Sequence, residues 1–245
     1  MIATAPATPI LAECRDIILD IAPELRPDPL YVTDEAALAV AGGLILGWAC
    51  NETESYPRQI LEASGEWQGP GRFISLALNK LETPSAVRCV ALHEAAHLLP
   101  ARPVTTTDKP PSPAAVRWNR GDIRLSLAAS NYGPADEPWT DDDCHGWKFI
   151  RRALHLHHRA TVAGYDVDLH GLCAGVQYGC VWPHYYAEEL GDEPARLASL
   201  TFDEIESFKP PDGFMALWNQ DVAKHFYFQH LALNRKESRH EYIAE

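Results

Sequence analysis

The sequence contains no hydrophobic run long enough to cross a membrane. A membrane-spanning helix needs about 18 consecutive apolar residues, and the apolar segments of this chain are shorter. Residues 1–6 also lack the basic region and the apolar segment of a secretory signal. We therefore expect neither a transmembrane helix nor a signal peptide, and we expect a cytoplasmic location. Internal repeats and low-complexity segments are absent as well, so a globular fold is expected.

Basic residues and cysteines are also scarce. The chain has 21 Lys and Arg against 34 Asp and Glu, which gives a net charge of −13 at pH 7. An acidic surface repels nucleic acid and anionic membranes, so we expect neither as a partner. The six cysteines are scattered along 245 residues. In a chain of this size without a signal, they predict reduced thiols rather than a disulfide framework.

What the sequence does contain is the motif His-Glu-x-x-His, at His93, Glu94 and His97. Residues four apart share one face of a helix, so the two imidazoles can bind one metal ion. Glu94 is adjacent and can deprotonate a water molecule. This pattern is typical of zincin metalloproteases, in which Zn²⁺ is the metal and the glutamate is the general base. The alternative is a chance pair of histidines on an ordinary helix.

The surroundings of the motif favour the metal site over chance. Thr83 can cap a helix, Pro84 suits its first turn, and Pro100 ends the apolar run. Within residues 84–99 the only full charges are Arg88 and Glu94, which predicts a buried helix. A buried glutamate beside two histidines needs a compensating charge, and a metal ion supplies one.

A catalytic zinc site needs a third protein ligand and leaves a fourth position for water. We favour His145, at the start of a helix predicted over residues 141–160, where Gly146 allows close approach. The main alternative is a carboxylate, Glu188 or Glu189, in a helix predicted over 182–200. The other histidines of the helix predicted over 141–160 lie on a different face from His145 and are interpreted as surface residues: His155, His157 and His158.

A resemblance to a known family rests on these two segments. Leu92 to Leu98, followed by Cys144 to Phe149 with its His-Gly-x-x-Phe pattern, resembles the SprT-like (Spartan-type) zinc metalloproteases. In that family the histidine of the second motif, on a later helix, completes the site. The resemblance implies that His93, His97 and His145 are the ligands and that Glu94 is the base. This chain departs from the family in the long gap before His145, in its acidic character and in having no Cys-x-x-Cys ribbon.

The predicted fold is α+β, with a zincin-like core and a mainly helical C-terminal extension. In the core, a small mixed sheet containing a strand at 72–79 packs on the helix at 84–99, and the helix at 141–160 lies across from it. The strand at 72–79 is either at the sheet edge, where a peptide can add to it, or inside the sheet. Residues 1–164 form the predicted catalytic domain, with a Pro-rich insertion at 100–139, and residues 165–245 form the extension. Further elements are expected as helices at 8–21, 202–208 and 214–233, a strand at 30–33 and a turn at 210–213, whereas 36–50 fits either strands or a helix.

Weaker patterns leave further alternatives open. Cys173, Cys180 and His184, with Cys144, could hold a second zinc ion, but their spacing fits buried thiols better. The three aspartates at 141–143 fit the charged start of a helix. Alternatively, one of them orients a ligand imidazole. The candidates for stabilising an oxyanion are Tyr165, Tyr178, Tyr185 and Tyr186.

The function predicted from the sequence is a zinc-dependent metallopeptidase that hydrolyses a protein or peptide substrate. Glu94 would be the general base, and His93, His97 and His145 the metal ligands. The alternative is a non-catalytic zinc-binding or protein-interaction module with a degenerate site. The sequence leaves the substrate and the oligomeric state open.

Overall fold

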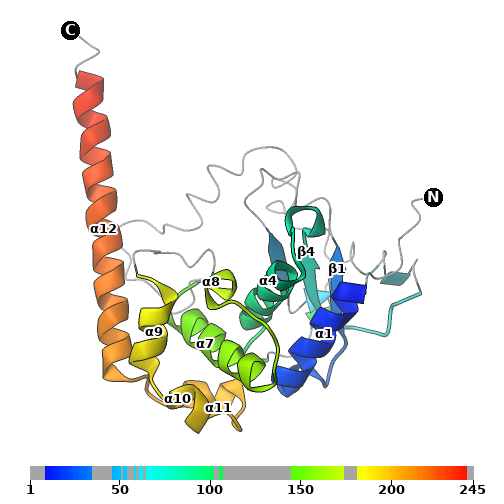
Figure 1. Ribbon diagram of the computed structural model, residues 1–245. Coiled ribbons are helices and arrows are strands. Elements are labelled where there is room, and N and C mark those ends of the chain that lie inside the picture. The colour runs from blue at the N-terminus through cyan, green and yellow to red at the C-terminus, as the bar shows by residue number, and fades with distance from the viewer. Residues whose placement is uncertain are drawn as a thin grey trace.

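Figure 1 shows the computed structural model of the protein, which is α+β with more helix than strand. Among the residues that the structure describes, no helix is both long enough and apolar enough to span a membrane. The described residues are 9–34, 46–50, 52–53, 58, 61–62, 65–101, 105–106, 145–173 and 181–241. Most of the predicted insertion at 100–139 therefore lies outside the described residues.

The main sheet is small and mixed, as predicted, with strand order β1-β4-β2. Strand β4 pairs in parallel with β1, with Val32 opposite Ile74, and antiparallel with β2, with Ala49 opposite Ile74. A second sheet joins β3 and β5 in parallel. The strand bounds are β1 Leu30–Asp34, β2 Gly47–Cys50, β3 Glu52–Thr53, β4 Arg72–Leu76 and β5 Thr105–Thr106.

Strand β4 confirms the strand predicted at 72–79 over its first five residues, and the short 3₁₀ helix η2 (Leu78–Lys80) follows it. The possibility that this strand lies at the sheet edge is wrong, because β4 is the middle strand and all five of its residues are buried. Ile74 and Leu76 face the main core, whereas Phe73 faces a smaller cluster with Tyr31 and Leu61. Both faces of β4 are thus covered by apolar side chains.

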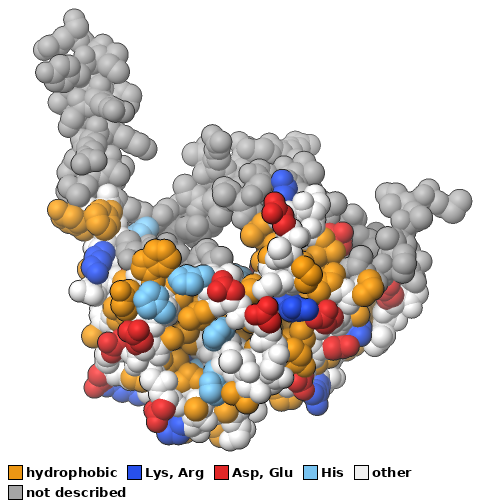
Figure 2. Space-filling view, viewed as in Figure 1, with side chains coloured by type: hydrophobic (Ala, Val, Ile, Leu, Met, Phe, Trp, Pro, Cys, Tyr) orange, Lys and Arg blue, Asp and Glu red, His pale blue; other side chains and the backbone are white. Residues whose placement is uncertain are grey.

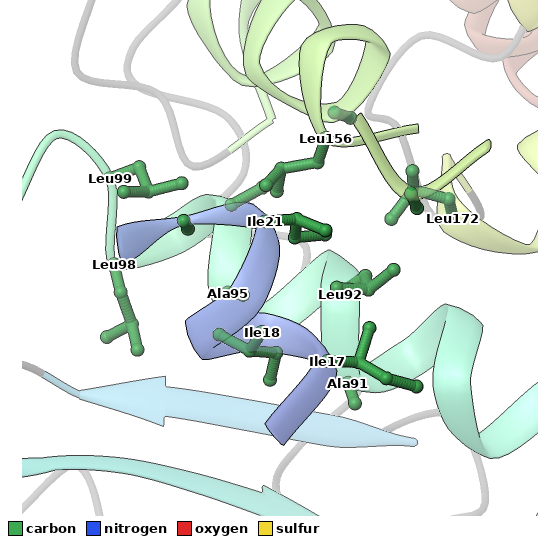
Figure 3. Close-up of a cluster of buried hydrophobic side chains, with 14 of the residues drawn as sticks. Ile17, Ile18, Ile21, Ala91, Leu92, Ala95, Leu98, Leu99, Leu156 and Leu172 are labelled. Atoms are coloured by element: carbon green, nitrogen blue, oxygen red, sulfur yellow. The ribbon is translucent and has the colours of Figure 1, made fainter. Parts of the chain in front are cut away.

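Helices α1 (Pro9–Ile21) and α4 (Pro84–His97) pack on the sheet and on each other. Both confirm predicted helices. The Thr83 hydroxyl accepts a hydrogen bond from the Ala86 N–H at 3.1 Å, and Pro84 occupies the first turn. Figure 3 shows the isoleucines of α1 meeting the buried residues of α4, with Leu156 and Leu172 joining from later in the chain. Helix α4 is buried along most of its length, as its low charge predicts.

The rest of the described chain is a helical layer in which α7 packs against α4. The bounds are η1 Pro23–Leu25, α7 Trp147–Val162, α8 Leu169–Leu172, α9 Pro183–Leu190, α10 Glu193–Arg196, α11 Phe202–Ser207 and α12 Asp212–Glu241. Helix α12 extends well past the body of the molecule (Figure 1). Helix α8 lies between α4, α7 and α9 and contacts all three.

Two predictions in this layer are wrong. The single helix predicted over 182–200 is two helices, because Gly191 has a φ of 61° that ends α9. The turn predicted at 210–213 is only partly a turn, because Asp212 and Gly213 already belong to α12, which also continues beyond the predicted end at 233.

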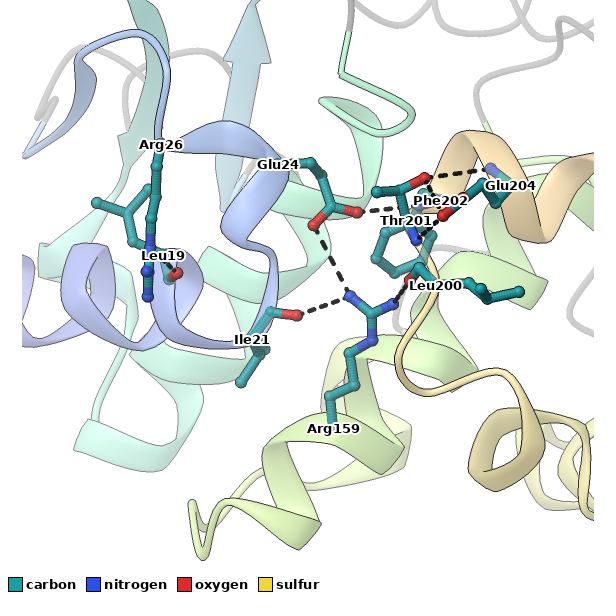
Figure 4. A network of polar contacts seen from close by, with 9 residues as sticks. All are labelled: Leu19, Ile21, Glu24, Arg26, Arg159, Leu200, Thr201, Phe202 and Glu204. Carbon is teal, nitrogen blue, oxygen red and sulfur yellow. Dashed lines mark hydrogen bonds and ion pairs between the residues drawn. The ribbon is translucent and has the colours of Figure 1, made fainter.

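Arg159 of α7 connects the end of α1 with the segment that leads into α11 (Figure 4). Its guanidinium donates to the carbonyl oxygen of Ile21 at 2.9 Å and to that of Leu200, and it lies 4.6 Å from the centre of the Phe202 ring. Glu24 accepts a hydrogen bond from the Phe202 N–H at 3.0 Å. One hydrophobic core accordingly contains residues from Leu11 to Ile205. The division of the chain at residue 164 stays a prediction, and this core is continuous across it.

Candidate metal centre

Three imidazoles converge where the end of α4 meets the start of α7. The Nε2 atom of His145 lies 3.1 Å from that of His93 and 3.2 Å from that of His97. Among the residues that the structure describes, these are the three His, Cys, Asp or Glu side chains whose ligand atoms all lie within 4.8 Å of one another. The three histidines are therefore close enough to hold one metal ion.

His145 reaches this position from a turn, not from a helix. The prediction that it lies in the first turn of a helix over 141–160 is wrong, because α7 begins at Trp147 with Gly146 as its N-cap. The backbone at Gly146 is extended, with φ −71° and ψ −175°, which takes His145 off the helical path. The aspartates at 141–143 lie outside the described residues.

The geometry and chemistry of the three nitrogens fit a metal ion. A tetrahedral site with metal–nitrogen distances of about 2.0–2.1 Å separates its ligand nitrogens by about 3.3 Å, close to the distances found here. The Nδ1 atom of His93 lies 2.9 Å from the carbonyl oxygen of Leu172. Because that oxygen can only accept, Nδ1 carries the proton, and Nε2 of the neutral ring presents its lone pair to the cluster.

The surroundings keep these imidazoles uncharged. Burial lowers the pKa of His97 to about 2, with the neighbouring His145 adding to the effect, and burial lowers the pKa of His145 to about 4. Burial also lowers the pKa of His93. At neutral pH all three rings are therefore in the neutral form that binds metal ions.

Phe149 forms the apolar side of the cluster. It follows His145 by four residues and is buried on α7. The centre of its ring lies 4.7 Å from that of His93, 4.5 Å from that of His97 and 4.9 Å from that of His145. One aromatic ring thus fixes the orientation of all three imidazoles and excludes water from that side.

Glu94 directly follows His93 on α4, and its side chain packs against the backbone of β2 at Gly47. A Cβ atom placed on Gly47 would lie 2.7 Å from Oε1 of Glu94 and 2.8 Å from Cγ1 of Val90. Only glycine leaves room for the Glu94 side chain there. Burial raises the pKa of Glu94 to about 8. Sequence reasoning missed Gly47, although a glycine inside a strand-like segment can signal a close approach of another group.

Comparisons of the chain with models of known protein families, with curated proteins and with solved structures found no match. The interpretation of the three-histidine group therefore depends on its own geometry.

The carboxylates considered as alternative ligands lie elsewhere. Glu188 and Glu189 are exposed on α9, and the carboxylate of Glu189 packs against Gly213 at the start of α12. Neither joins the three-histidine group. The structure thus brings His145, and not these glutamates, to the motif of α4.

The histidines of α7 were predicted to be surface residues, and this is wrong for His155. Its side chain is fully buried, because α10 covers that face of α7. Its Nε2 atom donates to Oε1 of Glu193 at 3.0 Å, and the same oxygen accepts from Nε of Arg151 at 2.7 Å. His157 is half-buried and donates to the carbonyl oxygen of Val167 at 3.1 Å. His158 is also half-buried.

The other candidate residues do not join the centre. The hydroxyl of Tyr165 donates to Asp20 at 3.0 Å and that of Tyr186 donates to Asp221 at 2.8 Å. Tyr185 is exposed, with its ring 4.1 Å from that of His184. Cys173 is a buried thiol whose pKa is raised to about 12 by burial. Cys144, Tyr178 and Cys180 lie outside the described residues.

Proposed function

We propose that the protein is a zinc-dependent metallopeptidase of the zincin type, similar to the SprT-like family, with a protein or peptide as its substrate. The observation that supports this proposal most is the convergence of three imidazole Nε2 atoms, with the buried Glu94 directly after His93 on the same helix. A set of three nitrogen ligands suits zinc among the metals that proteins use for hydrolysis.

In this proposal each residue of the site has a separate task. His93, His97 and His145 hold the metal, and Phe149 keeps their rings in place. A zinc ion bound there would act as a Lewis acid on the substrate carbonyl and would lower the pKa of a water molecule. Glu94 accepts the proton of that water and passes it to the leaving amine. A dication nearby would favour the charged form of Glu94, which is the form that a base requires.

The second candidate function is a non-catalytic zinc-binding module. A structural zinc site is usually closed by four protein ligands. Among the described residues three ligand atoms converge, which favours an open, catalytic site. The cytoplasmic location and the protein or peptide partner stay predictions.

The proposal is tested by metal analysis together with peptide hydrolysis. We expect about one zinc ion per chain in the wild type and in Glu94→Gln, because the glutamate is not a ligand. Hydrolysis of a mixed peptide library should fall by at least about a hundredfold in Glu94→Gln, since proton transfer is lost. Glu82→Gln, at an exposed glutamate just before α4, is the matched control and should behave as the wild type.

Two results would contradict the proposal. Zinc bound by the wild type without hydrolysis of any peptide would favour the binding module. A wild type that binds no zinc would remove the metal centre itself.

A further inference from the structure

Helix α8 is a single turn of four residues that lies against the metal centre. A helix this short is not stable by itself, so its contacts hold it in place. The carboxylate of Asp168 caps it by accepting from the Gly171 N–H at 2.7 Å. The side chain of Leu172 is fully buried in the main core. The Cys89 thiol, on α4, lies 3.5 Å from the carbonyl oxygen of Asp168.

This arrangement of α8 places one hydrogen-bond acceptor next to a proposed metal ligand. The carbonyl oxygen of Leu172 accepts from Nδ1 of His93 at 2.9 Å. This bond fixes which nitrogen of His93 carries the proton and how the ring is turned. Partners of this kind behind a ligating histidine typically change metal affinity by about 10- to 100-fold when they are lost.

Gly171 sets how close α8 comes to α4. A Cβ atom on Gly171 would lie 3.0 Å from Cβ and 3.1 Å from Sγ of Cys89. Both distances are shorter than ordinary contacts between carbon or sulfur atoms. Alanine is preferred to glycine inside a helix, so the local preference of α8 opposes glycine here, whereas its close packing against Cys89 favours glycine.

We propose that Gly171 and Cys89 are a positioning pair, which holds the Leu172 carbonyl against His93 and thereby sets the affinity of the metal centre. This inference depends on the metal centre of the proposed function, but not on peptide hydrolysis. Adding a methyl group at Gly171 moves α8 away from α4, and the carbonyl oxygen of Leu172 moves with it. The His93 ring then loses its fixed orientation.

The test measures Zn²⁺ affinity by competition with a chelator, using the full chain. Gly171→Ala should bind Zn²⁺ about tenfold more weakly than the wild type. The double variant Cys89→Gly/Gly171→Ala is compared with the single variant Cys89→Gly. Their Zn²⁺ affinities should agree within about threefold, because the glycine at 89 makes room for the methyl group added at 171. Ala86→Gly lowers helix stability near the other end of α4 and should leave the affinity unchanged, which separates positioning from a general loss of stability.

A second readout is the NMR resonance of the His93 Nδ1–H proton. In the wild type, its chemical shift should be that of a hydrogen-bonded proton. In Gly171→Ala, the resonance should shift, or disappear because the proton exchanges with water, both with and without Zn²⁺. If Gly171→Ala does not fold, variants of the helix cap Asp168 are used instead. Asp168→Ala should weaken Zn²⁺ binding and change the His93 resonance. Asp168→Asn can still cap the helix and should show the Zn²⁺ affinity and the His93 resonance of the wild type.

Wild-type affinity together with an unchanged His93 resonance in Gly171→Ala, or in Asp168→Ala, would overturn the positioning role. A wild type that binds no Zn²⁺ would instead contradict the proposed function. In that case the resonance of the metal-free protein still decides whether the pair positions His93.

Discussion

Glu94 of α4 and Gly47 of β2 lie on different elements but share one small space between them. Glu94 can serve as a base only if its carboxylate has a fixed position relative to the metal ligands, and β2 supplies the surface that fixes it. Oε1 of Glu94 lies 2.7 Å from the place that a side chain at Gly47 would take. At the scale of single residues, the proposed site thus depends on the absence of a side chain at Gly47 as much as on the carboxylate of Glu94.

Gly47→Ala should therefore separate metal binding from catalysis. The added methyl group displaces the Glu94 carboxylate, and a displacement of about 1 Å can reduce the rate by about a hundredfold. We expect kcat/KM for a peptide substrate to fall by at least about tenfold, while the Zn²⁺ dissociation constant stays as in the wild type. A variant that retains wild-type kcat/KM would show that the position of Glu94 does not depend on Gly47.

His145→Ala should weaken Zn²⁺ binding by an order of magnitude or more, as should His93→Ala and His97→Ala. His158→Ala, on α7 and outside the three-histidine group, is the matched control and should bind as the wild type. Competition with a chelator measures the Zn²⁺ affinity of all four variants. Wild-type affinity in His145→Ala, with a loss in Glu188→Ala or Glu189→Ala, would mean that a carboxylate is the third ligand.

At the scale of elements, α7 begins two residues after His145 and is held in place by a buried polar group in its middle. Arg151 and Glu193 are almost fully buried and form an ion pair at 2.7 Å, and His155 donates to the same carboxylate. Burial lowers the pKa of His155. Burial alone would raise the pKa of Glu193, but the hydrogen bonds from His155 and Arg151 lower it.

Both shifts predict that stability decreases in acid. A histidine whose pKa is lowered on folding binds more protons in the unfolded chain, so stability is lost as the pH falls below about 6.5, the ordinary pKa of histidine. A glutamate with a lowered pKa adds stability above its ordinary pKa of 4.5, and this stability is lost as the pH falls further. The losses therefore occur in sequence, His155 first.

His155→Gln should make the protein less sensitive to pH between 7.5 and 5.5. A neutral group that does not titrate removes a loss of at most about 1.4 kcal/mol per pH unit. Urea unfolding with a chelator present, at several pH values, measures the difference. His158→Gln is the control on the same helix. Parallel losses in the wild type and in His155→Gln would contradict a role for His155 in acid sensitivity.

The elements that the sequence predicted best are those with local signals. Thr83 and Pro84 mark the start of α4, and the low charge of residues 84–99 predicts its burial, as the structure shows. His93 and His97 follow from helix geometry alone. The central position of β4 depends on pairing with β1 and β2, and the burial of His155 depends on α10. Such contacts join residues far apart in the chain, so local patterns do not encode them.

At the scale of the whole molecule, one core contains residues from α1 near the N-terminus and from α11 in the C-terminal part of the chain. Arg159 makes this connection through Ile21, Leu200 and the Phe202 ring. On the face drawn in Figure 2, acidic and basic side chains of the described residues are interspersed, and several histidines gather next to hydrophobic side chains. Because the net charge of −13 repels nucleic acid, we still predict that nucleic acid is not a partner.

Arg159→Met should lower the free energy of unfolding by about 2–4 kcal/mol, because hydrogen bonds from a half-buried charged group are lost. Unfolding in urea should stay a single transition, since α1 and α11 share one core. Arg26→Met is the control, because Arg26 is exposed and donates to the carbonyl of Leu19, and it should change stability by less than about 0.5 kcal/mol. Two separate transitions in the wild type would contradict a shared core.

The central claim is that His93, His97 and His145 hold one zinc ion and leave one position open. X-ray absorption at the zinc edge of the loaded full-length protein tests it most directly. The account predicts three imidazole nitrogens at about 2.0–2.1 Å and one further oxygen, with one imidazole fewer in His145→Ala. A sulfur ligand at about 2.3 Å, or a spectrum that His145→Ala leaves unchanged, would contradict it.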